Sequence, residues 1–63
     1  MEVMPVITLN LASEERTVLG QVLEAEQARL LVEIRHTDHR AYREEVRRKL
    51  AVVERLLGEC QAP

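Results

Sequence analysis

Two stretches of regularly spaced apolar residues, separated by a short polar segment, limit what this chain can fold into. In the first stretch, one side of a helix with about 100° per residue would carry Leu19, Leu23, Leu30 and Ile34. In the second, the same spacing groups Tyr42, Val46, Leu50, Val53, Leu56 and Leu57. Residues 35–40 supply no core side chain. The pattern predicts an all-α fold with two helices, at about residues 13–35 and 39–58.

Polar residues and a glycine indicate where these helices begin and end. Asn10 or Ser13 is expected to cap the first helix, because a short polar side chain can accept a hydrogen bond from the first free amides. Thr37 or Asp38 is expected to do the same for the second helix. Gly58 is the predicted stop of the second helix.

The short connection makes the two helices antiparallel neighbours. Facing residues then have numbers that add up to about 76, which sets apolar residues opposite apolar residues. The same alignment brings Glu26 opposite Lys49, and Glu33 opposite Arg43. We expect these two ion pairs to fix the alignment of the hairpin, since a half-buried charge without a partner is strongly destabilising.

A hairpin of 63 residues cannot bury an adequate core by itself. The single cysteine, Cys60, excludes an internal disulfide and a multi-cysteine zinc site, so association with a second chain is the remaining way to gain stability. The sequence therefore predicts a homo-oligomer: a four-helix bundle dimer, a homotetramer or another higher oligomer. Its predicted interface consists of Leu19, Leu23, Leu30, Ile34, Tyr42, Val46, Val53 and Leu57.

Residues 1–12 are predicted to form an apolar, extended N-terminal arm ahead of the helical hairpin of residues 13–60. Ile7, Leu9 and Leu11 alternate with Thr8 and Asn10, which is the period of a β-strand. The arm is either a strand or an apolar tail that packs on the helices. A lone strand is unstable in water, so the arm is expected to bind a second copy or another protein.

Charge and composition exclude several classes of protein. No apolar run is long enough to span a bilayer, and the lone cysteine without a signal-like start predicts a cytoplasmic protein. The formal charge of -2 gives no overall attraction to nucleic acid. An alternative role is that of a nucleic-acid accessory protein that uses the arginine stripe Arg40, Arg43 and Arg47, although glutamates interleave with this stripe.

Candidate catalytic and metal-binding residues are few. His36, Asp38 and His39 have the right side chains for a metal, but a turn would offer two or three ligands at best, so polar turn residues are the preferred interpretation. The Glu-x-x-His motif of di-iron bundles does not occur. We expect no enzymatic activity, no cofactor and no metal, and a buried apolar role for Cys60.

The run from Glu33 and Ile34 through Thr37 and Asp38 to Tyr42-Arg43 resembles short uncharacterised bacterial helical-hairpin proteins with a Glu-Ile-x-x-Thr-Asp-x-x-x-Phe/Tyr-Arg motif. The similarity covers about residues 11–57. It implies a helical hairpin and no activity. It also implies a structural corner in which Asp38 or Thr37 caps a helix and Glu33 pairs with Arg43.

Overall fold

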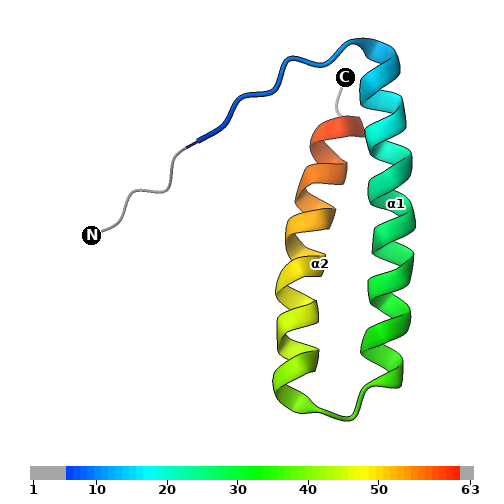
Figure 1. The fold of residues 1–63 in the computed structure, drawn as a ribbon, viewed down its shortest axis with the longest axis vertical. Coiled ribbons are helices and arrows are strands. Elements are labelled where there is room, and N and C mark those ends of the chain that lie inside the picture. Colours follow the sequence, from blue (N-terminus) through cyan, green and yellow to red (C-terminus); the bar gives the residue numbers. More distant parts are fainter. Residues whose placement is uncertain (1–5, 62–63) are drawn as a thin grey trace.

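The structure, a computed structural model, describes residues 6–61 as an antiparallel helical hairpin. Helix α1 spans Ser13–His36 and helix α2 spans Arg40–Gln61. The two helices lie side by side and the connection between them forms one end of the molecule (Figure 1). The predicted all-α hairpin is therefore confirmed. Within residues 6–61 no strand is present, so residues 6–12 of the arm are extended but unpaired.

The first turn of α1 is closed by a glutamate and not by either of the predicted caps. Ala12 is the N-cap residue, with extended backbone angles of φ -69° and ψ 161°. Its amide donates a 2.8 Å hydrogen bond to Oε1 of Glu15, which reaches back from three residues along the helix. The predictions of Asn10 and Ser13 are wrong, because Ala12 is the N-cap residue and Glu15 accepts the hydrogen bond from its amide.

The corner between the helices is held by an arginine. Nη2 of Arg43 donates a 2.9 Å hydrogen bond to the carbonyl of Thr37, and the amide of Arg43 donates to the carbonyl of His39, which makes His39 the residue that opens α2. The hydroxyl of Thr37 accepts a long 3.4 Å bond from the amide of His39. The expected cap by Asp38 is wrong: in the described part of the chain its side chain makes no hydrogen bond.

Helix α2 continues through Gly58, so the predicted stop at this residue is wrong. The reason lies in α1. Nε of Arg16 donates a 2.6 Å hydrogen bond to the carbonyl of Cys60, and its Nη2 lies 3.5 Å from the carbonyl of Glu59. These last carbonyls of α2 would otherwise lack a protein partner, and a cation is favoured at the negative end of a helix. Gly58 keeps a negative φ and does not end the helix.

The core is a single seam between α1 and α2. It consists of the buried residues Leu23, Leu30, Val46, Val53 and Leu57, with Leu19, Ile34, Leu50 and Cys60 packed against it. The helices come close at Gly20, where an added Cβ would lie 3.8 Å from Cβ of Cys60. Gly20 is therefore buried at a close helix contact and does not interrupt α1.

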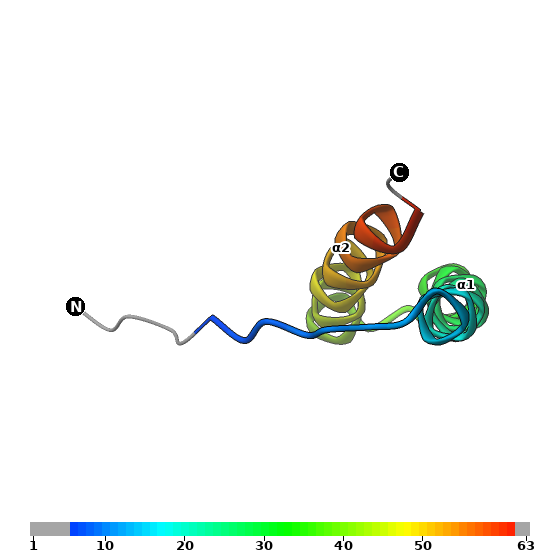
Figure 2. The ribbon, with the colours of Figure 1, turned by 90° about the horizontal axis from the view of Figure 1, so that it is seen from above.

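The arm leaves the hairpin sideways. From the start of α1 it runs past α2 and continues away from both helices (Figures 1 and 2). Val6, Ile7 and Leu9 are 92%, 78% and 68% exposed, so they do not pack on their own hairpin. Neither helix combines the length and the apolar character that crossing a bilayer requires, as far as residues 6–61 are concerned.

Candidate interaction surface

One side of the hairpin carries two hollows, and we call this side the open face. It is defined by two rows of residues spaced by seven, which is about two helical turns. On α1 the row is Leu19, Glu26 and Glu33; on α2 it is Tyr42, Lys49 and Leu56. The hollow near the helix connection is lined by Arg29, Leu30, Glu33, Tyr42, Glu45, Val46 and Lys49. The groove near the termini involves the arm and is described below.

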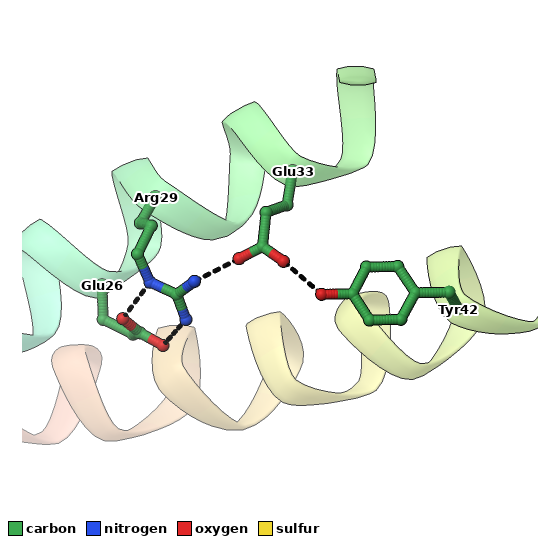
Figure 3. A network of polar contacts seen from close by, with 4 residues as sticks. All are labelled: Glu26, Arg29, Glu33 and Tyr42. Atoms are coloured by element: carbon green, nitrogen blue, oxygen red, sulfur yellow. Dashed lines mark hydrogen bonds and ion pairs between the residues drawn. The ribbon is translucent and has the colours of Figure 1, made fainter. Parts of the chain in front are cut away.

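A network of four polar side chains lies at the hollow near the connection (Figure 3). The guanidinium group of Arg29 holds Glu26 with two hydrogen bonds, of 2.8 Å from Nε and 2.6 Å from Nη2. It also forms an ion pair with Glu33 through Nη1. The hydroxyl of Tyr42 donates to the other carboxylate oxygen of Glu33. The network therefore joins α1 to the first turn of α2.

These contacts shift the pKa values of the groups involved. Hydrogen bonds from Arg29 lower the pKa of Glu26; partial burial opposes this shift, and the charge of Lys49 adds a smaller lowering effect. The hydrogen bond to Glu26 raises the pKa of Arg29 above its usual value. The hydrogen bond to Glu33, followed by the charge of that carboxylate, raises the pKa of Tyr42. At neutral pH these shifts favour an ionised Glu26, a charged Arg29 and a neutral Tyr42 phenol.

Among residues 6–61, neither predicted ion pair between the helices lies within the 4.0 Å of an ion pair. The described ion pairs within 4.0 Å that involve Glu26 and Glu33 both go to Arg29. Arg29 lies three residues after Glu26 and four before Glu33, which is the spacing at which side chains meet on one helix. Lys49 acts on Glu26 only at longer range, and Arg43 is turned into the corner at Thr37. Arg29, the cation that pairs with both glutamates, is thus not one of the predicted site residues.

The raised pKa of Tyr42 can be measured directly, because the chain contains no other tyrosine and no tryptophan. Its ultraviolet absorbance should titrate above the ordinary tyrosine pKa of about 10, and Glu33→Gln should bring the midpoint back toward that value. Since the protonated phenol is the form that donates to Glu33, this contribution to stability is present at neutral pH. It is lost as the pH rises through the raised pKa.

The control for this titration is Glu24→Gln, which removes the same charge from α1 outside the network. This variant should leave the Tyr42 midpoint unchanged. If Glu24→Gln and Glu33→Gln lower the midpoint equally, the shift comes from general negative charge and the hydrogen bond to Glu33 is not its cause.

The second hollow is an apolar groove between the arm and the helices, which we call the arm groove. Its volume is about 700 Å³. The arm contributes Val6, Ile7, Thr8, Leu9 and Leu11, and the helices contribute Arg16, Leu19, Leu23, Arg55, Leu56, Glu59 and Cys60. Cys60 is a free, half-buried thiol. The groove is thus lined mainly by aliphatic side chains, with charged groups at its border.

The residues predicted as an interface between copies lie mainly in the core of the hairpin itself. Five of them, Leu23, Leu30, Val46, Val53 and Leu57, are buried by the neighbouring helix and have little surface left for a second chain. Leu19 and Ile34 are half-buried, and Tyr42 is 44% exposed. The apolar side chains that remain uncovered on the helices are instead Val18, Val22, Leu31, Val32, Val52 and Leu56.

Two of the three arginines in the stripe on α2 already have partners within the chain. Arg40 lies 3.6 Å from Glu44 in an exposed ion pair, and Arg43 donates to the carbonyl of Thr37 and closes the corner. Within residues 6–61, Arg47 is the member of the stripe without a hydrogen bond or ion pair. The three arginines therefore do not form a continuous row of free guanidinium groups for a phosphate backbone.

The histidines lie at the corner: His36 is the last residue of α1 and His39 the residue before α2. In the part of the chain that the structure describes, no three His, Cys, Asp or Glu side chains gather as a metal site would require. No family model, no curated protein and no solved structure matches the chain, so its function has to be inferred from the surface itself.

Proposed function

We propose that the chain is a structural or protein-interaction module that works as a helical homo-oligomer, built as a four-helix bundle dimer or a larger assembly of hairpins. The observation that carries this proposal is the large amount of apolar side chain that the hairpin leaves uncovered. On the arm and the helices these exposed residues are Val6, Ile7, Leu9, Leu11, Val18, Val22, Leu31, Val32, Val52 and Leu56.

The hairpin is one layer thick. With its arm the chain extends over 40 × 34 × 14 Å, and the shortest extent is close to the diameter of a single helix with its side chains. Stable domains are built from at least two packed layers, because each helix buries its apolar side against another element. A second hairpin on the open face would supply the missing layer.

The exposed area supports the same conclusion. A folded monomer of 7.3 kDa is expected to expose about 4,200 Å², whereas this chain exposes 5589 Å². Part of the difference of about 1,400 Å² belongs to the arm, where Val6, Ile7 and Leu9 are largely exposed. The radius of gyration, 14.0 Å, is likewise above the value of about 11 Å for a compact chain of this length.

The proposal assigns no catalytic step to the chain and places it in the cytoplasm, where Cys60 stays a free thiol. Analytical ultracentrifugation over a range of protein concentrations tests it. We expect a dimer or a larger assembly with a helical circular dichroism spectrum, and a melting temperature that rises with concentration because assembly and folding are linked. A folded monomer at every concentration up to the millimolar range would overturn the proposal.

A further inference from the structure

The arm enters α1 through a single extended residue, Ala12. Its backbone leads into Ser13 without an intervening loop, and the bond from the Ala12 amide to Glu15 holds this geometry. Leu11, next to the cap, is 42% exposed, and the exposed fraction of the apolar side chains increases toward Val6. The apolar side chains of the arm are therefore largely uncovered.

The arm also has the features of an open strand edge. Ile7, Leu9 and Leu11 alternate with polar residues, and the hydrogen bonds described for the backbone outside the helices include none from residues 6–11. An extended segment with free amides and carbonyls and an apolar side readily pairs with another chain. In a lone hairpin only water satisfies these groups.

The groove beside the arm complements it. Leu19, Leu56 and Cys60 provide an apolar wall, and the volume of about 700 Å³ is large enough for several side chains. The chain thus carries a largely exposed apolar segment and, between that segment and the helices, an open apolar groove. A partner with the same two features can satisfy both at once.

We propose that the arm groove binds the arm of a second copy of this chain, so that two copies exchange residues 6–11 reciprocally around a two-fold axis. Each copy then gives and receives the same contacts, which closes the assembly at a dimer. The two arms lie next to each other and can pair their backbones, while Ile7, Leu9 and Leu11 enter the partner's groove. This inference rests on the proposed homo-oligomer and specifies the contact that holds it.

A pair of substitutions in the arm tests the exchange. Leu9→Glu puts a charge on a groove-lining side chain that is exposed within its own hairpin, so the hairpin should still fold. Asn10→Glu puts the same charge on a neighbouring arm residue that does not line the groove. We expect Leu9→Glu to weaken dimerisation by roughly ten-fold or more in sedimentation equilibrium, and Asn10→Glu to change it less than about two-fold.

Isotope-filtered NOE spectroscopy on a mixture of labelled and unlabelled wild-type chains gives a second measurement. We expect contacts between methyl groups of Ile7 or Leu9 of one copy and Leu56 of the other. A dimer that withstands Leu9→Glu, or arm contacts found only within one copy, would overturn the exchange and leave the homo-oligomer in place. A wild-type chain that stays monomeric would overturn both, and retention of a different protein by the arm would not support this inference.

Discussion

Leu30→Ala is expected to lower the free energy of unfolding by about 2–5 kcal/mol, the range for removing a fully buried leucine side chain. Leu30 is 1% exposed, the lowest value among the core residues, and it lies in the seam with Val46 and Val53. A domain of this size has a total stability of about 3–9 kcal/mol. The substitution therefore removes a large part of the stability, and the variant should melt at a clearly lower temperature than the wild type.

The matched control is Leu31→Ala, the same change at the next residue, whose side chain is 39% exposed. It should lower stability by less than about 1 kcal/mol. Leu30→Met, which nearly conserves volume, should stay folded with a loss below about 1.5 kcal/mol. Urea unfolding followed by circular dichroism, repeated at several protein concentrations for all variants, measures the differences. Equal losses at Leu30 and Leu31 at every concentration would show that the seam is not the core, because a contribution of Leu31 to an interface between copies would change with concentration.

The hairpin could be predicted because it depends on features that are close together in the sequence. The apolar spacing on each helix determines which side packs, and the short connection determines that the helices are antiparallel. Cross-hairpin contacts such as Arg16 with Cys60 and Glu33 with Tyr42 agree with the predicted alignment. This alignment requires only that a long apolar row on α1 meets a similar row on α2.

The errors concern side chains with more than one possible partner. Arg29 competes for Glu26 and Glu33 from within α1, and an intrahelical pair needs no particular distance between the helices. Arg43 is drawn to the carbonyl of Thr37. A residue pattern states which partners are possible, whereas the choice between them depends on rotamers and on distances between the helix axes.

The end of α2 was missed for a different reason. Gly58 is a common stop signal, but the contact that extends the helix comes from Arg16, which lies far away in the sequence. The first turn of α1 is likewise held by the bond between Ala12 and Glu15. Both helix ends depend on hydrogen bonds that periodicity does not reveal.

Replacing the two glycines with alanine is expected to raise the stability of the chain, whereas Leu30→Ala lowers it. Both lie inside helices with negative φ, so alanine fits their backbone and should add about 1 kcal/mol of stability at each position. At Gly58 an added Cβ meets nothing within 4 Å, and at Gly20 it meets Cβ of Cys60 at 3.8 Å, an ordinary contact. The double variant Gly20→Ala, Gly58→Ala should melt roughly 5–15 °C higher than the wild type.

A leucine should affect stability differently at Gly20 and at Gly58. Gly20→Leu has to place its side chain against Cys60 in the close contact between α1 and α2, and we expect a loss of about 1–3 kcal/mol from overpacking. Gly58→Leu points into open space and should remain neutral or stabilising. Thermal unfolding of the four single variants gives the comparison. If leucine is tolerated equally at both positions, the helices do not approach closely at Gly20; if alanine destabilises at Gly20, they approach more closely than 3.8 Å allows.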